Sequence, residues 1–330
     1  MRARLARCAA TALTVLAASA CSSESLTRAL EEPIRIPDSQ FREGALPGSP
    51  PLTADDINAG VTPTPPVVSG ISLVNALIPP REPARSISGV ASPGSVAIGV
   101  RFADLGSGYW LLPTRAADAV NDNALEWRFR AAFGADAPPG KHQLLFAAID
   151  ANGHAGNQVG LSLCLLPEIP DNGSSCDPSQ APPALVVSLG WQAAVDLDLR
   201  VVTPSGKVVD SKHPTTAEKG ANGKLDVSAA GVGVIDYDSF AGCVPDGRRR
   251  ESLVFQSSPA PGTYLLYANL YDACGQPGAS FEASVSRAVP GHEPDTLRLE
   301  EVIHQAGELQ AVHANGGDAL GLFVTSFTVR

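Results

Sequence analysis

Short apolar runs, many of them alternating with polar residues, recur from about residue 67 to the end of the chain. Strand side chains point alternately to two faces, so a period of two is typical of half-buried strands. The turn residues that separate these runs are plentiful, with 31 Gly and 28 Pro, whereas charged residues make up only 18%. The sequence has no convincing long helix and no fixed-period repeat. The pattern therefore predicts an all-β protein.

The strand-like runs form two groups, and 330 residues are enough for roughly two domains. The first group predicts an Ig-like β-sandwich over residues 67–166. The second predicts a larger, jelly-roll-like sandwich over residues 184–330. A connector rich in Pro, Ser and Asp, residues 167–183, separates them. We therefore expect two tandem β-sandwiches.

The first 20 residues have the composition of an export signal, with three arginines, an apolar stretch and small residues before Cys21. The apolar stretch is too short to remain in a bilayer. The segment Ala18-Ser19-Ala20-Cys21 resembles a bacterial lipobox, with Ala18 where that motif usually has Leu. The resemblance implies lipidation of Cys21, and Ser22 implies sorting to the outer membrane. Ordinary secretory cleavage, which leaves a free Cys21, is the alternative.

Residues 21–66 lack sustained periodicity and are rich in proline, so we expect a lipid anchor followed by a disordered Pro-rich linker. The chain has six cysteines. With Cys8 removed and Cys21 lipidated, an even number remains, which suits an oxidising compartment. We expect Cys164 to pair with Cys176, and Cys243 with Cys274, although other pairings stay open.

The formal net charge is −10, and the sequence has no basic patch with interleaved aromatic residues. An acidic surface repels phosphate backbones, which argues against a nucleic-acid partner. The expected partners are the membrane, through the lipid anchor, and an unknown envelope protein or polysaccharide.

The stretch Val195–Val202 predicts a strand with Asp196, Asp198 and Arg200 on one face. Asp236 and Asp238 repeat the spacing of the two aspartates, and Glu251 lies a short distance beyond them. Calcium binds hard oxygen ligands, and clustered carboxylates otherwise repel one another. These five acids therefore form a candidate calcium site.

The same acids have a structural alternative. A sheet with one solvated face needs polar side chains there, and Arg200 or Arg248–Arg250 can neutralise the carboxylates. Aspartates also accept hydrogen bonds from loop N–H groups. A hydrolase using paired carboxylates is a weaker alternative, because Asp196 and Asp198 share one strand face. The sequence contains no G-x-S-x-G, H-E-x-x-H or phosphate-loop motif, so we expect no enzyme.

A second candidate surface lies in the run TYLLYANLYD. Tyr267, Asn269 and Tyr271 share the face opposite to Tyr264 and Leu266. An exposed row of tyrosines with an amide can stack on and hydrogen-bond sugar rings. Carbohydrate binding is therefore the alternative function, although such tyrosines also pack beneath loops.

Two resemblances support the predicted domains. Residues 137–157 carry a P-G turn, an alternating strand and a D-x-x-G turn, and this resembles the penultimate-strand region of bacterial Ig-like domains. The second half carries a further set of motifs: Trp191, Asp196–Leu199, Pro204–Gly206, Asp236–Ser239, Cys243, Glu251 and Pro261–Tyr264. In these motifs it resembles pre-peptidase C-terminal-like sandwiches. That resemblance implies a non-catalytic appendage of a secreted protein, and some such domains bind calcium or matrix polymers. We expect a binding, adhesion or assembly module.

Overall fold

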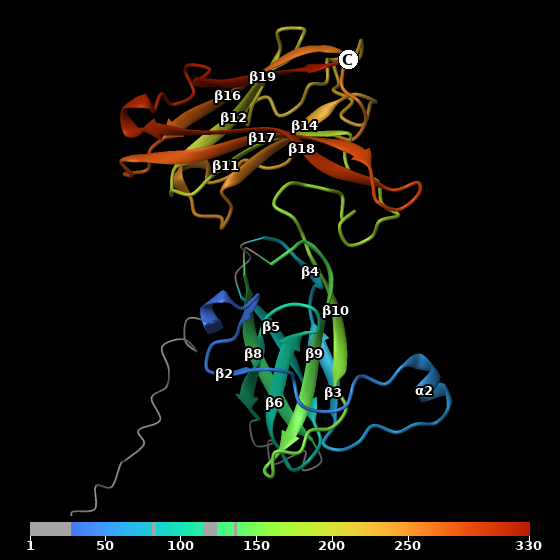
Figure 1. Cartoon of the computed structure of the whole chain (residues 1–330). Coiled ribbons are helices and arrows are strands. Elements are labelled where there is room, and N and C mark those ends of the chain that lie inside the picture. The colour runs from blue at the N-terminus through green and yellow to red at the C-terminus, as the bar shows by residue number, and fades with distance from the viewer. Residues whose placement is uncertain (1–27, 81–83, 115–123, 135–136) are drawn as a thin grey trace, which may run out of the picture.

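The computed structural model describes residues 28–80, 84–114, 124–134 and 137–330. The predicted signal segment 1–20 and the lipidation site Cys21 lie outside the described residues. The described chain forms four β-sheets, arranged as two sandwiches in tandem (Figure 1). Within it, no helix is both long enough and apolar enough to cross a membrane.

The first sandwich pairs a four-stranded sheet, in the order β1-β8-β5-β3, with a six-stranded sheet, in the order β2-β7-β6-β9-β10-β4. Its strands are β1 (Ile34–Arg35), β2 (Gln40–Glu43), β3 (Val68–Leu73), β4 (Leu77–Ile78), β5 (Arg85–Ala91), β6 (Ser95–Phe102), β7 (Gly108–Pro113), β8 (Leu125–Phe133), β9 (Gly140–Asp150) and β10 (Val159–Leu165). Trp127 stacks on Phe129 and Phe146 between the sheets. Gly89 of β5 lets that indole approach, since a Cβ there would come within 2.3 Å of the ring.

The strand order follows an Ig domain. Strands β3, β5 and β8 pair in the order A-B-E, and β6, β9 and β10 pair in the order C-F-G. The short β4 runs parallel to β10, while the other pairs in this sandwich are antiparallel. The period-two pattern thus led to the correct sandwich class.

The prediction that residues 21–66 form a linker outside the sandwich is wrong for β1 and β2. Ile34 pairs with Phe133 of β8, in the place that strand D holds in an Ig domain. Gln40 pairs with Leu111 of β7. Ile34 is only 1% exposed. Two short strands are too brief to show a period, yet β1 buries Ile34, β2 packs a partly buried Phe41 against the core, and both cover sheet edges.

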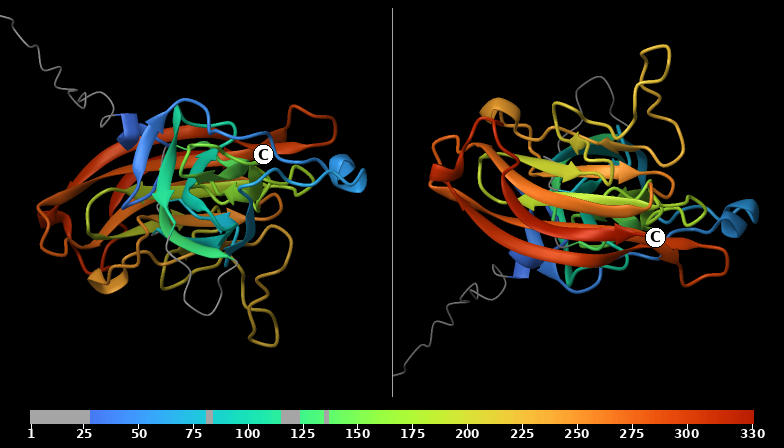
Figure 2. Two further views of the ribbon diagram at one scale, coloured as in Figure 1. Left: turned by 90° about the horizontal axis from the view of Figure 1, so that it is seen from below. Right: turned by 90° about the horizontal axis from the view of Figure 1, so that it is seen from above.

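Farther along the predicted linker, a five-residue helix, α2 (Ala54–Asn58), lies on an excursion that projects from the side of the first sandwich (Figure 2). Thr53 caps this helix, because its hydroxyl accepts the Asp56 N–H while Asp56 accepts the Thr53 N–H. No residue of the helix is buried. The excursion therefore adds little to the core.

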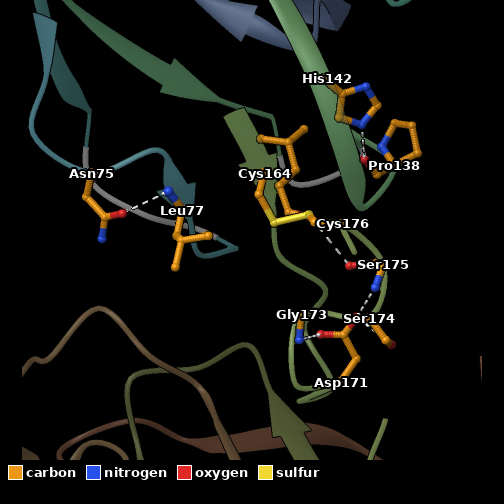
Figure 3. The surroundings of a disulfide bond; sticks show 11 residues. Asn75, Leu77, Pro138, His142, Cys164, Asp171, Gly173, Ser174, Ser175 and Cys176 are labelled. Carbon is orange, nitrogen blue, oxygen red and sulfur yellow. Dashed lines mark hydrogen bonds between the residues drawn. A yellow bond between two sulfur atoms is a disulfide. The ribbon is translucent and has the colours of Figure 1, made fainter. Parts of the chain in front are cut away.

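The connector is folded back on the first sandwich. A disulfide joins Cys164 at the end of β10 to Cys176, as predicted (Figure 3). Between them, the Asp171 carboxylate accepts the N–H groups of Gly173 and Ser175 at 2.9 and 2.7 Å. These bonds satisfy loop N–H groups that no strand pairs with, and so hold the turn closed.

The second sandwich pairs a five-stranded sheet, β14-β15-β11-β17-β18, with a four-stranded sheet, β13-β12-β16-β19, and its strand pairs are antiparallel. Its elements are β11 (Leu185–Trp191), β12 (Asp196–Val202), β13 (Val208–Val209), β14 (Gly233–Ile235), β15 (Arg250–Phe255), β16 (Gly262–Asp272), β17 (Gly278–Pro290), β18 (Leu297–Gln310) and β19 (Leu322–Val329), with 3-10 turns η1 (Ala241–Cys243) and η2 (Ala311–His313). Tyr264 stacks on Phe327 at 5.1 Å in the core.

Candidate metal site

Both faces of β12 are covered. Leu197, Leu199 and Val201 are fully buried in the core between the sheets. Asp196 and Asp198, on the opposite face, are also only 3% exposed. The expected solvated face is therefore absent at this strand, because loops from elsewhere in the domain lie over it.

Three of the five predicted acids converge. Asp196 and Asp198 of β12 and Asp238, from the loop after β14, each offer an oxygen within 4.8 Å of the other two. Asp238 is exposed, whereas the two strand aspartates are buried. The cluster therefore opens to solvent on the side of Asp238.

Glu251 of β15 lies beside this cluster but has a different role. Its side chain is completely buried. Its carboxylate accepts the Leu199 N–H at 2.8 Å and the Ser239 N–H at 3.1 Å. Burial, followed by the charge of Asp198, raises its pKa well above the ordinary value. Glu251 thus joins β12 to the loop that carries Asp238, and positions both.

Asp236 is likewise outside the converging cluster. Its Oδ1 accepts the Ser252 N–H at 2.8 Å, and its own N–H donates to the Ser252 carbonyl at 2.9 Å. Asp236 is exposed as a residue, but desolvation of its carboxyl raises the pKa, and the hydrogen bond from Ser252 opposes that rise. Asp236 therefore extends the pairing of β14 with β15.

Hydrogen bonds hold the two strand aspartates in place. Asp196 accepts the Gly242 N–H at 2.7 Å, and Asp198 accepts the Ser211 hydroxyl at 3.0 Å. Gly242 has a left-handed φ of 58°, which favours glycine at this turn. The loop is thereby shaped to place a backbone N–H on Asp196.

The second predicted disulfide, Cys243–Cys274, is also present. It ties the loop that carries Asp238 and Gly242 to the residues just after β16. Its sulfurs lie near Asp272, within 4.8 Å of a carboxylate oxygen. Because both sulfurs are bonded to each other, they are not thiolate ligands in this oxidised form.

The carboxylates raise one another's proton affinity. Burial raises the pKa of Asp196 to about 6, and the charge of Asp198 adds to the rise. Burial also raises the pKa of Asp198, with Asp238 contributing. Partial desolvation by the surrounding loop and the charge of Asp246 raise the pKa of Asp238, although the residue is exposed. The site therefore accumulates negative charge that a proton or a cation relieves.

Arg200 neutralises the cluster only in part. Its guanidinium donates to the carbonyls of Gly317, at 3.0 Å, and of Ala319. Its Nε lies 3.6 Å from a carboxylate oxygen of Asp210. The charge of Arg200 lowers the pKa of Asp198 somewhat, but burial outweighs it.

The predicted cationic run is engaged elsewhere. The guanidinium of Arg248 stacks over Tyr237 at 4.0 Å, and that of Arg249 stacks over Phe240 at 4.1 Å. Arg250 forms an ion pair with Glu168 of the connector at 2.7 Å. These contacts leave the three converging carboxylates without an arginine from that run.

The predicted tyrosine face is not a continuous exposed row. Asn269 is completely buried, and its Nδ2 donates to the Ala319 carbonyl at 2.8 Å. Tyr267 packs edge-on against Phe323 at 5.5 Å, and Lys212 lies over the Tyr271 ring. The segment after η2 covers the amide, so Asn269 is not available to a ligand at this surface.

A scan against protein-family models finds no match, and a search of curated proteins finds no significant relative. One similar solved structure is the C-terminal domain of the AgI/II polypeptide BspA from Streptococcus agalactiae. It is 9% identical, and the match covers 74% of this chain and 82% of that chain, with a TM-score of 0.18. A likeness that weak carries no functional information.

Proposed function

We propose that this protein is an exported, non-catalytic binding, adhesion or assembly module of the cell envelope, and that calcium stabilises its second sandwich. The observation that carries the calcium proposal is the convergence of Asp196, Asp198 and Asp238 within 4.8 Å. Two of these carboxylates are buried, and water therefore screens their repulsion poorly.

Calcium suits this arrangement better than a softer metal. Its ligands are hard oxygens, and carboxylates serve it in one- or two-oxygen modes. The cluster lacks histidine and thiolate ligands, which zinc and copper prefer. The open side at Asp238 leaves room for water to complete the coordination shell.

The two disulfides support export, because such bonds persist in oxidising compartments. The lipobox-like segment before Cys21 supports a lipid anchor, and Ser22 supports the outer membrane. The partner in this proposal is an envelope protein or a polysaccharide.

The first test is thermal melting of the purified protein in EDTA and then in about 2 mM calcium. Ligand at a hundred times its dissociation constant stabilises a protein by about 2.7 kcal/mol. We expect the melting temperature to rise by several degrees. Asp198→Asn should abolish the rise, because it removes a buried ligand charge.

Asp236→Asn is the matched control. An asparagine oxygen can still accept the Ser252 N–H, and Asp236 lies outside the converging cluster. This variant should keep the calcium response. A wild-type melting curve identical in EDTA and calcium would contradict the calcium proposal and leave the three aspartates as structural polar residues.

Carbohydrate binding remains the alternative function. Phe323 is 51% exposed and packs against Tyr267, so an exposed aromatic surface is present at Tyr267 even though Asn269 is buried. Aromatic rings can stack on sugars. A glycan array without binding to any polysaccharide would exclude this alternative.

A further inference from the structure

The buried amide of Asn269, which pairs across the strands with Asp198, has an unsatisfied oxygen. Its Nδ2 donates to the Asn315 Oδ1 at 3.0 Å and to the Ala319 carbonyl at 2.8 Å. Its Oδ1 is buried and has no hydrogen-bond partner among the described residues. Leaving a buried acceptor unpaired is unfavourable, so native structures normally give it a partner.

The orientation of this amide is fixed by its neighbours. The Ala319 carbonyl can only accept hydrogen bonds, and it also accepts one from Arg200. Turning the amide over would place two acceptor oxygens against each other. The unpartnered atom is therefore the oxygen and not the nitrogen.

Asn269 lies directly opposite Asp198 in the pairing of β16 with β12. Side chains that face each other across antiparallel strands have Cβ atoms about 4.5–5.5 Å apart. A calcium ion lies about 2.3–2.6 Å from each ligand oxygen and so joins oxygens that are up to about 5 Å apart. A single ion at Asp198 is within the reach of both side chains.

We propose that the Oδ1 of Asn269 is a further ligand of the cation held by Asp196, Asp198 and Asp238. This inference rests on the proposed calcium function. It assigns to Asn269 a role inside the domain, in place of the sugar contact expected from its sequence. The neutral amide adds an oxygen without adding repulsion to the three carboxylates.

The competing occupant is a water molecule. The Nε of Arg200 is also buried without a hydrogen-bond partner among the described residues. A water shared by this donor and the Asn269 oxygen would satisfy both groups. Calcium and water at the Asn269 oxygen can be distinguished by experiment. Calcium affinity depends on Asn269 only if its oxygen binds the ion.

The test is calorimetric titration of the full protein with calcium alone. Asn269→Ala should weaken calcium binding by about tenfold or more. Asn315→Ala removes one acceptor of the Asn269 amide but keeps its oxygen, and should change the affinity less than about threefold. Ser284→Ala is the control, because it also removes a buried polar group without a partner, the hydroxyl of Ser284 on β17 in the other sheet. This variant should leave the calcium affinity unchanged.

An affinity of Asn269→Ala equal to that of the wild type would overturn the inference in favour of water. Equal losses in Asn269→Ala and Asn315→Ala would also overturn it, because Asn269 would then act only through the loop. Absence of calcium binding by the wild type is a distinct result, since it removes the proposed function itself.

Asn269→Asp gives a second measurement if the alanine variant does not fold. It keeps an oxygen at the same position but cannot donate to Ala319. We expect it to retain calcium binding and to melt at a lower temperature in EDTA. Complete loss of calcium binding in this folded variant would overturn the ligand role.

Discussion

Asp196 combines burial, one backbone N–H and neighbouring carboxylates, and burial has the largest effect on its pKa. The hydrogen bond from Gly242 lowers the pKa, but burial outweighs it, and the charge of Asp198 raises the pKa further. Glu251 shows the same balance more strongly, because it is completely buried. The site is therefore most unfavourable when fully ionised and metal-free.

This balance gives the metal-free protein a defined pH response. The pKa of Asp196 is about 6 in the folded chain, against an ordinary value of 3.8. Between these values the folded state binds more protons than the unfolded state, so stability falls as the pH rises. We expect the melting temperature in EDTA to decrease across this window, and less so in Asp196→Asn.

Calcium affinity should increase with pH, whereas the stability of the metal-free protein decreases, because calcium competes with the proton on Asp196. Calcium affinity should weaken as the pH falls through about 6. Titrations at pH 7.5 and 5 measure it. The same affinity at both pH values would show that Asp196 does not bind the ion.

At the scale of elements, alternation predicted β12 and β16, because polar or tyrosine side chains recur at every second position over most of each strand. It missed β7 (Gly108–Pro113), whose run of large apolar residues ends in proline. The run KLDVS at residues 224–228 has the alternation of a strand, but it forms only an isolated bridge at Leu225. The alternation of residues within one segment indicates which face is buried. It does not indicate whether another strand is available to pair with that segment.

The candidate site was predictable to a similar degree. The spacing of Asp196 and Asp198 placed both on one face, as found. Asp238, Asp236 and Glu251 looked equivalent in the sequence, yet only Asp238 joins the cluster. Glu251 instead accepts the N–H of Leu199. The short β13 pairs only with Val201 and Val202 of β12, and the sequence does not reveal where that pairing ends.

The role of β1 can be tested by mutation. Ile34→Ala should lower the free energy of unfolding of the first sandwich by about 2–5 kcal/mol, since it opens a cavity in the core beside β8. Leu30→Ala is the control, because Leu30 is 64% exposed, and should change stability by less than about 0.5 kcal/mol. Chemical denaturation followed by tryptophan fluorescence measures both. Equal stability of the two variants would show that β1 does not contribute to the first sandwich and behaves as part of the linker.

At the scale of the whole molecule, the two sandwiches have separate cores. The contacts described between the connector and the second sandwich are polar. Glu168 forms an ion pair with Arg250, and the Asn172 Nδ2 donates a hydrogen bond to the Gln256 Oε1 at 2.8 Å. Interfaces of this kind couple domains weakly. The cluster of Asp196, Asp198 and Asp238 belongs entirely to the second sandwich.

Scanning calorimetry should therefore show two unfolding transitions, of which calcium raises only one. Asp198→Asn should remove the calcium-dependent shift without moving the other transition. A joint shift of both transitions in calcium would show instead that the connector makes the two sandwiches unfold as one unit.

The Cys164–Cys176 bond also has a mechanical consequence (Figure 3). When the two ends of the molecule are pulled apart, tension passes from β10 directly across the sulfur bridge to Asp177. The loop that it closes, between cysteines 12 positions apart, lies outside this covalent path, and about 40 Å of extensible chain is withheld. Glu168 and Asn172, which contact the second sandwich, lie within this closed loop, so the disulfide limits how far the loop can extend when the two sandwiches are pulled apart.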